Sequence, residues 1–475
     1  MAELVACSHR GPYVYRRGPD GYTGQRGGGG LINAVGLAMQ GHGGTWIAAA
    51  MSPDERALAK DHPEGREEDG IRLRLLDIPE REHALHYDVV SNEYLWFAFH
   101  YLFDVPLEPV FDDALGRAWD AYRTVNRIYA EAVAGCDAPS AVLVEDYHLI
   151  TVGEELRRLG YDSAPLLYFH HTPWCAPDYL SIFPRSLRTE IVHSMLAYDS
   201  IGFHARRWAD NFLACCRRFC PDVRIEGDSV RIGDRTVTVC VAPVPLDVQR
   251  LTDQAASEKV DGWVQRLEEQ RQDRFMLVRV DRIDLSKNPL RGFLAFESLL
   301  ESDPSLASRV WFCAMQYPSR LKVERYRRYF TRCTEVVSRI NERFGAHAPG
   351  DEGPLGWYFA DDFSRSLAGL RTYDALLVNP VFDGLNLVAK EGALLNERHG
   401  GIILSRNAGA FEELGEHTWD VNPFDVSGTA DAMRRTIEED PGDREVRASE
   451  LRRLVTGSDP AGWVRTRAAA AGLSL

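Results

Sequence analysis

The chain has 475 residues, of which 45% are hydrophobic and 26% charged, so its composition is typical of a soluble protein and its length predicts two domains of similar size. Its formal net charge of −15 at pH 7 argues against nucleic acid or an anionic membrane as a partner, because both require a broad basic face. No apolar run is long enough to span a bilayer and the first residues lack a secretory pattern, which predicts a cytoplasmic protein.

The first half of the chain is expected to combine strands and helices. Apolar runs of strand type stand at 4–8, 45–49, 141–144, 166–169 and 200–203, and helical patterns include 113–134 and 206–219. Residues 231–241 alternate around Gly233 and Asp234 as a hairpin does. The Ala-Pro-Val-Pro segment at 242–245 then predicts a hinge between the two halves.

Three cysteines, Cys215, Cys216 and Cys220, cluster on a predicted helix of this half. No second pair of Cys or His residues stands at the spacing of a zinc site, so we interpret them as buried free thiols. The nine cysteines of the chain are also too scattered for a disulfide scaffold. We therefore infer no metal and no cofactor.

The second half alternates strand and helix patterns with short breaks. The predicted strands are 275–280, 310–315, 355–359, 375–378 and 401–404, and the predicted helices are 290–300, 325–344, 364–373, 385–396 and 410–414. Such alternation implies right-handed crossovers and a parallel sheet with helices on both faces. The second half therefore predicts a complete Rossmann-like domain.

One predicted strand of this half ends in a turn that opens a helix. Asp383 lies at this corner, followed by the backbone N–H groups of Gly384, Leu385 and Asn386 at the helix N-terminus. Such N–H groups are available for an anion or a sugar oxygen, and Glu391 can accept hydrogen bonds from a vicinal diol such as a ribose. In an α/β sheet, ligands bind at this edge. A diphosphate sugar fits this arrangement.

A second strand, at 275–280, leads to Arg282 and Lys287 in the same way. Only five of the 55 basic residues are lysine, and two of these, Lys287 and Lys390, belong to the two corner segments. Lysine supplies a compact point charge and arginine a planar fork, so together they can neutralise both phosphates of a leaving nucleoside diphosphate.

The segments 282–287 and 383–391 resemble the donor-binding motifs of trehalose-6-phosphate synthases, which are retaining glycosyltransferases. Further motifs of the first half follow in the same order: Ser8-His9-Arg10, Gly29-Gly30-Leu31, Tyr87, Ser91-Asn92, Leu95-Trp96, Glu145-Asp146-Tyr147-His148-Leu149 and His170-His171-Thr172-Pro173. The match runs from about Leu4 to about Asp425. Many motifs in one order are far more specific than any single one.

The resemblance implies an α/β fold of the GT-B type, in which two Rossmann-like domains have parallel sheets that face across a cleft. It places an acceptor-binding domain at 1–243 and a nucleotide-sugar donor-binding domain at 244–458, with a C-terminal helix at about 459–475 that packs back on the first domain. The expected partners are a nucleoside-diphosphate glucose and glucose 6-phosphate. Neither nucleic acid nor a membrane is expected, and a homo-oligomer is left open.

The resemblance also assigns residues. The residues implied in catalysis are Asp146, His171, Arg282 and Lys287. The residues implied in donor binding are Gly29, Gly30, Arg282, Lys287, Asp361, Asp362, Asp383, Gly384, Leu385, Asn386, Leu387 and Glu391. The residues implied in acceptor binding are Arg10, Tyr87, Trp96, Asp146 and Arg320. Taken alone, the two aromatic residues could equally be core residues, Arg320 a surface charge, and Asp146 and His171 structural hydrogen-bonding groups.

The implied reaction makes α,α-trehalose 6-phosphate with retention, through departure and attack on the same face of the sugar. Asp361 or Asp362 can accept both donors on one edge of guanine, which favours GDP-glucose over UDP-glucose or ADP-glucose. The alternative is that these aspartates cap the helix that follows them.

Some positions depart from the common pattern of the family, namely Asn288, Phe382 and the His-His-Thr-Pro-Trp segment that ends at Trp174. Asn288 and Trp174 also resemble validamycin-type pseudoglycosyltransferases, which couple a GDP-linked cyclitol to an aminocyclitol phosphate. Asp383 and the segment that ends at Glu391 suit a hexose and a ribose, and so favour a true sugar donor. A non-catalytic sugar-phosphate sensor is a third alternative, although the expected cationic residues are present.

Overall fold

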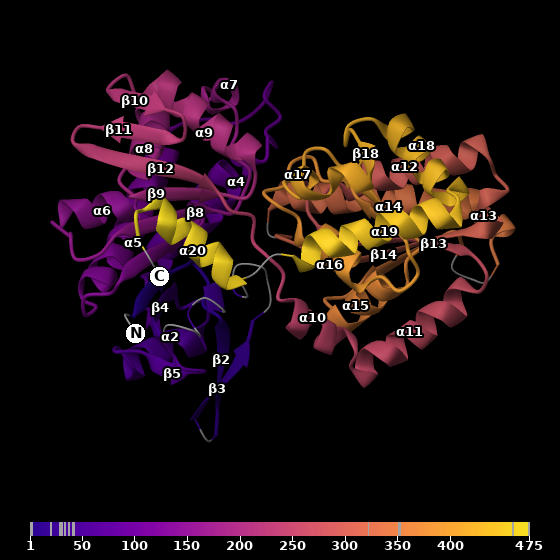
Figure 1. The fold of residues 1–475 in the computed structure, drawn as a ribbon, viewed down its shortest axis with the longest axis horizontal. Helices are drawn as coiled ribbons and strands as arrows, with labels where there is room; N and C mark the ends of the chain where they lie inside the picture. The colour runs from indigo at the N-terminus through magenta and orange to yellow at the C-terminus, as the bar shows by residue number, and fades with distance from the viewer. Residues whose placement is uncertain are drawn as a thin grey trace. The chain divides into compact units, whose positions relative to one another are not determined.

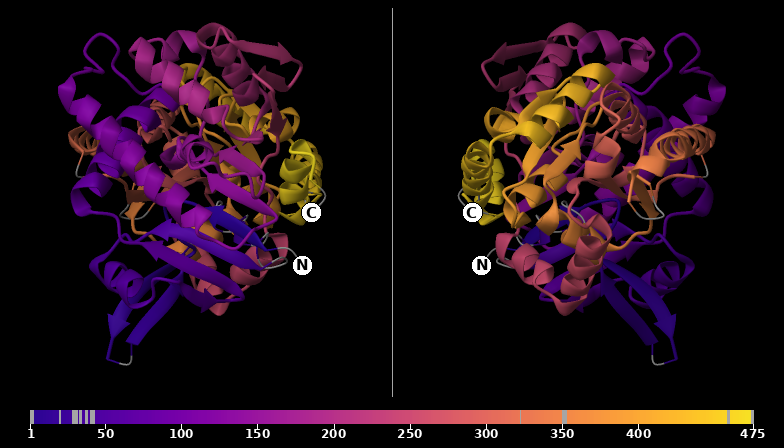
Figure 2. Two further views of the ribbon diagram at one scale, coloured as in Figure 1. Left: turned by 90° about the vertical axis from the view of Figure 1, so that its left-hand side faces the viewer. Right: turned by 90° about the vertical axis from the view of Figure 1, so that its right-hand side faces the viewer.

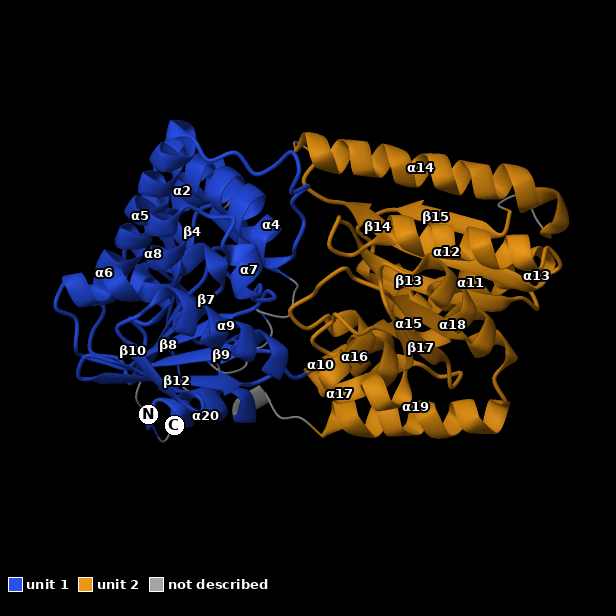
Figure 3. Cartoon of the chain, turned by 90° about the horizontal axis from the view of Figure 1, so that it is seen from above, with its two compact units in different colours: residues 1–245, 459–475 blue, residues 246–458 orange. Residues whose placement is uncertain are grey.

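The computed structural model describes residues 3–19, 21–27, 32, 35–36, 39, 43–321, 323–349, 353–457 and 460–473. The chain divides into two compact units (Figure 3). Unit 1 contains residues 1–245 together with 459–475, and unit 2 contains residues 246–458. The two units are described separately below.

Unit 1 is built on a ten-stranded sheet with the order β10-β11-β12-β9-β8-β7-β1-β4-β6-β5 among the described residues. Its strands are β1 (Leu4–Cys7), β4 (Gly44–Ala49), β5 (Arg66–Glu68), β6 (Ile71–Leu76), β7 (Ala141–Glu145), β8 (Leu166–His170), β9 (Ser200–Phe203), β10 (Val223–Glu226), β11 (Ser229–Ile232) and β12 (Arg235–Val241). The strands from β12 to β6 pair in parallel, whereas β10, β11 and β5 pair with their neighbours in antiparallel fashion. A separate hairpin joins β2 (Tyr13–Gly18) to β3 (Gly21–Arg26).

Most helices of unit 1 alternate with these strands in the sequence, and the helices cover the sheet (Figure 1). They are α2 (Pro53–Asp61), α3 (Glu80–Ala84), the π-helix η1 (Leu85–Leu95), α4 (Trp96–Phe99), α5 (Asp113–Ala134), η2 (Tyr147–Leu149), α6 (Val152–Arg158), α7 (Pro177–Leu180), α8 (Arg185–Met195), α9 (Arg206–Phe219) and α20 (Pro460–Ala470). The long helix α5 begins where the Asp112 carboxylate accepts hydrogen bonds from the N–H groups of Ala114 and Leu115.

The last helix, α20, belongs to unit 1 although 213 residues of unit 2 separate it from the rest of that unit in the sequence. Trp463 Nε1 donates a hydrogen bond of 2.8 Å to the Ala242 carbonyl, next to the end of β12. Ser200 Oγ, at the start of β9, donates to the Arg467 carbonyl at 3.3 Å. These bonds attach α20 to the half of the sheet that contains β9 and β12 (Figure 1).

Unit 2 contains a six-stranded parallel sheet among its described residues, with the order β15-β14-β13-β16-β17-β18. Some of its strands appear as orange arrows in the right-hand view of Figure 2. Its strands are β13 (Phe275–Ile283), β14 (Val310–Pro318), β15 (Leu355–Phe359), β16 (Ala375–Val378), β17 (Gly401–Ser405) and β18 (Trp419–Val421). Its helices are α10 (Val248–Ala255), α11 (Glu258–Arg271), α12 (Pro289–Ser302), α13 (Leu306–Arg309), α14 (Glu324–Phe344), η3 (Gly345–His347), α15 (Phe363–Thr372), α16 (Leu387–Leu395), α17 (Phe411–Leu414), η4 (Gly415–His417), α18 (Val426–Glu438) and α19 (Pro441–Thr456). Phe293 and Phe296 of α12 pack on Phe312 of β14 in its core.

The strand order of unit 2, numbered within the unit, is 3-2-1-4-5-6, which is the Rossmann order. Six strands of unit 1 follow the same order, from β6 through β4, β1, β7 and β8 to β9. The α/β fold with Rossmann-like parallel sheets that the sequence predicts is therefore confirmed. The order reverses between β1 and β7 in unit 1 and between β13 and β16 in unit 2, and a crevice for ligands lies at such a point, beyond the carboxyl ends of the strands.

Two boundaries differ from the predicted ones in ways that affect these crevices. Strand β13 continues to Ile283, three residues beyond the predicted end, so that Arg282 lies in the strand and pairs with Tyr317 of β14. Helix α16 begins at Leu387 rather than at residue 385, because Asn386 has a φ of 72° and a left-handed residue cannot continue a right-handed helix.

The corner after β16 is crossed closely by the loop after β17. The Gly409 N–H donates to the Asp383 carbonyl at 3.0 Å, and the Asp383 N–H donates to the Asn407 carbonyl at 3.1 Å. A Cβ atom on Gly409 would clash with the backbone carbonyl of Gly384. The loop after β17 therefore needs a residue without a side chain at this point.

We predict that Gly409→Ala destabilises the protein by about 1–3 kcal/mol, because the added methyl group forces two backbone segments apart. Thermal unfolding measures this as a lower midpoint temperature, by roughly 2–4 °C for each kcal/mol in a domain of the size of unit 2. Gly262→Ala on α11 is the matched control, since a Cβ there meets nothing within 4 Å and alanine favours a helix. Equal midpoints for the two variants would show that the close approach is not a constraint.

Candidate functional site

The corner after β16 in unit 2 carries an ion pair between two predicted site residues. Lys287 Nζ contacts Asp383 Oδ2, and Asn386 Nδ2 donates to the same oxygen at 3.1 Å. The side chains of Lys287 and Asp383 are 19% and 13% exposed, so the pair is accessible from the surface of the unit. The structure thus brings together residues that lie 96 positions apart in the sequence.

The helix that follows this corner starts with an ordered cap. The Asn386 side chain accepts a hydrogen bond from the Ala389 N–H at 3.3 Å. The N–H groups of Leu387 and Val388, in the first turn of α16, have no acceptor within the helix. Such groups and the helix dipole favour an anion beside Lys287.

Two arginines of unit 2 gather around one fully buried carboxylate, that of Asp284. Arg320 Nη1 donates to Asp284 Oδ2 at 2.8 Å, and Arg282 Nη2 lies 4.0 Å from the same oxygen. The side chains of Arg282 and Arg320 remain 33% and 15% exposed. Two cations therefore share one buried anion at the carboxyl end of β13.

Arg279, which the sequence interpretation missed, holds the Lys287 loop in place. Its fully buried guanidinium donates to Asn379 Oδ1 at 2.5 Å and to the Lys287 carbonyl, and forms an ion pair of 2.6 Å with Asp281. A buried charge must be paired, so this residue ties the end of β16 to the loop after β13. Its signal in the sequence is an arginine inside an otherwise apolar strand.

Glu391 of α16 has a pKa raised to about 7, because its surroundings exclude water. The carboxyl group is therefore poised to donate or to accept a hydrogen bond near neutral pH. Tyr317, also missed from the sequence, stands near Glu391 and opposite Arg282. Burial raises the pKa of Tyr317; the charge of Arg282 lowers this pKa, and the charges of Asp361 and Glu391 raise it.

The two aspartates that follow β15 have different roles in the structure. Asp362 Oδ1 accepts the Arg365 N–H at 3.1 Å and caps α15, as the structural alternative for this residue had it. Asp361 is exposed, and it lies between two exposed aromatic residues, Phe359 and Phe363.

Asp146 and His171 of unit 1 meet beyond the ends of β7 and β8. Asp146 has a φ of 75°, and its Oδ1 accepts the N–H groups of Tyr147 at 2.9 Å and of His171 at 3.3 Å. Burial raises the pKa of Asp146 although His171 and these two N–H groups act in the opposite direction. The other side of His171 faces Glu145, whose Oε2 lies 2.7 Å from His171 Nε2.

Arg10 and Tyr87 also meet in unit 1, beyond the end of β1. Arg10 Nη2 donates to the Tyr87 hydroxyl at 3.1 Å, and the Tyr87 ring stacks on His9 at 4.4 Å. Trp96 is only 8% exposed and packs on His100 at 3.8 Å, so most of its ring surface is used by the interior of the unit. Gly29 and Gly30 lie outside the described residues.

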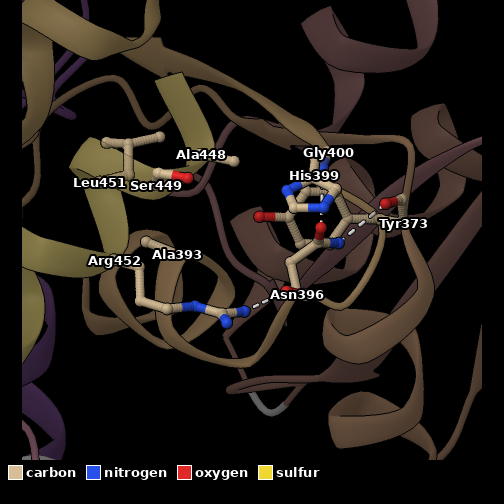
Figure 4. A pocket seen from close by; sticks show the side chains of 9 residues that line it. All are labelled: Tyr373, Ala393, Asn396, His399, Gly400, Ala448, Ser449, Leu451 and Arg452. Carbon is tan, nitrogen blue, oxygen red and sulfur yellow. Dashed lines mark hydrogen bonds between the residues drawn. The ribbon is translucent and has the colours of Figure 1, made fainter. Parts of the chain in front are cut away.

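Two pockets of the structure lie at the amino-terminal ends of the strands, away from the predicted site residues at the carboxyl ends. The pocket in Figure 4 lies at the amino-terminal ends of β16 and β17, against α19. It is lined by Tyr373, Ala393, Asn396, His399, Gly400, Ala448, Ser449, Leu451 and Arg452. The Asn396 side chain donates to the Tyr373 carbonyl at 2.8 Å and accepts from the Gly400 N–H at 2.7 Å. A second pocket lies at the start of β8 and β9 in unit 1. Neither contains a predicted site residue.

The described part of the chain has no cluster of His, Cys, Asp or Glu arranged to hold a metal ion. Within the same residues no helix is long and apolar enough to cross a membrane. Cys215, Cys216 and Cys220 are buried free thiols, as the sequence predicts.

Four histidine rings crowd beside Arg10. His9 lies 4.9 Å from His148, 5.2 Å from His83 and 5.3 Å from His86 between ring centroids. Burial, the three neighbouring imidazoles and Arg10 hold the pKa of His9 well below its usual range. Burial also lowers the pKa of His83, and that of His86 to about 4. These three rings are therefore neutral at pH 7.

This cluster predicts a loss of stability in acid. Between about pH 6.5 and pH 4 the unfolded chain binds protons at these histidines and the folded chain does not, so the unfolding free energy falls as the pH falls. We predict that His9→Phe, which keeps the stacking on Tyr87, makes this decline shallower by up to about 1.4 kcal/mol per pH unit. Denaturant unfolding between pH 7 and pH 5 measures it. His62→Phe, at an exposed position, should keep the wild-type slope, and an unchanged slope in His9→Phe would contradict the prediction.

Comparison with known proteins shows the family of the chain. Residues 3–471 match the family model of glycosyltransferase family 20. A trehalose-6-phosphate synthase from Mycobacterium sp. (strain JLS) is 32% identical, covering 98% of this chain and 95% of its own. A validamine 7-phosphate valienyltransferase from Streptomyces hygroscopicus subsp. jinggangensis (strain 5008) is 30% identical, with 89% and 84% covered.

Solved structures show the same fold. The crystal structure of an alpha,alpha-trehalose-phosphate synthase (UDP-forming) from Burkholderia vietnamiensis superimposes with a TM-score of 0.85 at 27% identity, covering 99% of this chain and 100% of its own. The two Rossmann-like sheets are thus those of the GT-B fold that the sequence predicts. With the family model matching almost the whole chain, the chain belongs to glycosyltransferase family 20.

Proposed function

We propose that this protein transfers glucose from a nucleoside-diphosphate glucose to the anomeric hydroxyl of glucose 6-phosphate and so makes α,α-trehalose 6-phosphate with retention. The observation that carries the proposal is a pair of partly exposed cations beyond the carboxyl end of β13: Lys287, whose partner Asp383 lies at the corner before α16, and Arg282. A fork and a point charge at a helix N-terminus suit the two phosphates of a nucleoside diphosphate. Relatives named trehalose-6-phosphate synthase support the choice of product.

Unit 2 is the donor-binding domain in this proposal. Arg282 and Lys287 bind the diphosphate, and Glu391 binds the ribose as an acceptor or donor of hydrogen bonds. The glucose hydroxyls contact the corner after β16, where the proposed groups are Asp383, Gly384, Leu385, Asn386 and Leu387.

Unit 1 is the acceptor-binding domain. The joined side chains of Arg10 and Tyr87 bind the phosphate of glucose 6-phosphate, and Trp96 contacts the sugar ring. Arg320, a residue of unit 2, is also proposed for acceptor binding. Asp146 lies on the acceptor side of the reaction centre and His171 contacts the donor glucose.

The chemistry follows from what these side chains can do. In this proposal Asp383, which pairs with Lys287, contacts the donor sugar, and no carboxylate of the protein attacks the anomeric carbon. We propose that the bond from the anomeric carbon to the diphosphate breaks and the glycosidic bond forms on the same face. The leaving phosphate oxygen accepts the proton of the acceptor hydroxyl. Arg282 and Lys287 stabilise the charge that develops on that oxygen, and positioning supplies the rest of the acceleration.

We predict that Lys287→Ala and Arg282→Ala each lower kcat by about two to three orders of magnitude, as loss of a comparable electrostatic group does. Steady-state kinetics with both substrates saturating measures this. Because Lys287 forms an ion pair with Asp383 and Arg282 lies against Asp284, a loss of turnover in both variants reflects shared charge stabilisation rather than damage to one ion pair. Lys259→Ala, at an exposed position of α11, is the control and should keep full turnover. Near wild-type turnover in either test variant would refute the role.

The base of the donor is guanine in this proposal, and Asp361 is the residue that supports it. Its exposed carboxylate can accept the N1–H and N2–H donors of guanine together, whereas uracil offers one such donor. Phe359 and Phe363 beside it are exposed aromatic surfaces on which a base can stack. Against it stands the relative from Burkholderia vietnamiensis, which is named as UDP-forming.

Comparing kcat/KM for GDP-glucose, UDP-glucose and ADP-glucose, with trehalose 6-phosphate detected as the product, tests the whole proposal. We expect the highest value with GDP-glucose, and we expect Asp361→Asn to reduce the advantage of that donor. Asp362→Asn weakens only the cap of α15 and should leave the ranking unchanged. A wild-type preference for UDP-glucose would reject guanine, and no product from any donor would reject the synthase.

The valienyltransferase relative makes a pseudoglycosyltransferase the second candidate. The two residues that suggested this candidate, Asn288 and Trp174, have structural contacts that reduce their weight as evidence for it. Asn288 is fully buried with a φ of 61°, and its amide donates to the Asn379 carbonyl at 3.0 Å and to the Pro423 carbonyl at 2.8 Å. Trp174 is also fully buried, packed edge-on against Phe212. Both residues have structural explanations and need no cyclitol substrate.

A further inference from the structure

We infer that a buried ion pair between Glu145 and Arg467 positions His171, so that the last helix of the chain determines how this histidine is presented to the donor sugar. The inference rests on the proposed function for the role of His171. It concerns two residues that the sequence motifs of the family did not single out for any role. Glu145 precedes Asp146 at the end of β7, and Arg467 lies on α20.

The three side chains form one continuous chain of contacts within unit 1. Arg467 Nη1 lies 2.8 Å from Glu145 Oε1, and Glu145 Oε2 lies 2.7 Å from His171 Nε2. Arg467 is 1% exposed and Glu145 is fully buried, whereas His171 is 12% exposed. The contacts therefore run from the interior of the unit to a residue that reaches its surface.

The surroundings of Arg467 make Glu145 its charge partner. The guanidinium lies over the rings of Phe169, at 5.0 Å, and Trp463, at 4.5 Å, so aromatic faces occupy much of its remaining surface. Within the described residues, Glu145 is the acidic side chain that forms an ion pair with it. A buried ion pair is a poor source of stability compared with apolar packing, so its presence here favours a role in orienting another group.

The charge on Glu145 decides which nitrogen of His171 carries the proton. Burial raises the pKa of Glu145, but Arg467 and His171 outweigh it and the net effect lowers the pKa. An ionised carboxylate can only accept, so His171 Nε2 must donate. Nδ1 is then the nitrogen left to interact with a substrate hydroxyl.

The backbone of His171 is fixed as well. Its N–H donates to Asp146 Oδ1 at 3.3 Å, so consecutive acidic residues hold the main chain and the ring of one histidine. Glu145 and Arg467 are thus positioning residues, which act through His171 and do not touch the substrate themselves.

The tautomer of His171 is the direct test. In long-range ¹H–¹⁵N correlation spectra, with His171 assigned by its disappearance in His171→Asn, we expect the proton of the neutral ring on Nε2. The double variant Glu145→Leu/Arg467→Met replaces the ion pair by apolar side chains of similar size, which protein interiors tolerate. We expect a mixture of tautomers in this variant. We also expect kcat with saturating acceptor to fall about 10-fold to 100-fold, the scale seen when the partner that orients a functional histidine is removed. The KM for glucose 6-phosphate should stay unchanged.

Two controls separate positioning from the docking of α20. Ser200→Ala and Trp463→Phe each remove a hydrogen bond of the helix and leave the ion pair in place, so both should keep the Nε2 tautomer. Arg467→Lys keeps the charge and should retain more activity than the double variant. A wild-type proton on Nδ1, or an unchanged tautomer in the double variant, would overturn the inference. A changed tautomer with wild-type kcat would overturn its functional half. If the wild-type protein makes no trehalose 6-phosphate, the proposed function fails, while the spectra still decide the positioning.

Discussion

The reversal of strand order in each parallel sheet is the constraint on which the rest of the structure depends. At β13 and β16, and again at β1 and β7, the chains that leave two adjacent strands turn to opposite sides of the sheet. Such a reversal leaves a crevice between the two chains, so we expect the side chains beyond these strand ends to satisfy one another or a ligand. Lys287 and Asp383 do so in unit 2, and Arg10 and Tyr87 do so in unit 1.

In both units, buried charged residues hold the exposed residues of the candidate site in position. Arg279 ties the loop that carries Lys287 to the end of β16, and Asp284 gathers Arg282 and Arg320. In unit 1, Glu145 has the corresponding place behind His171. A charge inside a protein is costly unless its partners are fixed, so each of these groups has a narrow choice of geometry. The exposed residue that contacts the buried charge is therefore restricted to a few orientations as well.

The sequence predicted the fold well because the fold depends on periodicity. The strands at 355–359, 375–378 and 200–203 and the helices at 113–134 and 206–219 have the predicted bounds, since apolar runs between turn residues leave little freedom. Of the candidate site, it singled out residues that follow strands, because polar groups there are conspicuous, and the structure brings some of them together, such as Lys287 and Asp383. It assigned no role to Arg279, Tyr317, Glu145 and Arg467, whose contacts are with residues far away in the sequence. Periodicity contains no information about such pairs.

Periodicity also does not predict which residues at the strand-end corners adopt a positive φ. Among the described residues, eight that are not glycine have a positive φ, and four of them stand at strand-end corners: Asp146, Asn288, Arg320 and Asn386. Asn and Asp tolerate this conformation because their short side chains bond to the local backbone, as Asp146 and Asn386 do here. Arginine has no such help, so the Arg320 conformation must be held by its contacts with Asp284 and Tyr326. Strain of this kind persists only where the surroundings determine it, which ties the direction of Arg320 to the buried carboxylate beneath it.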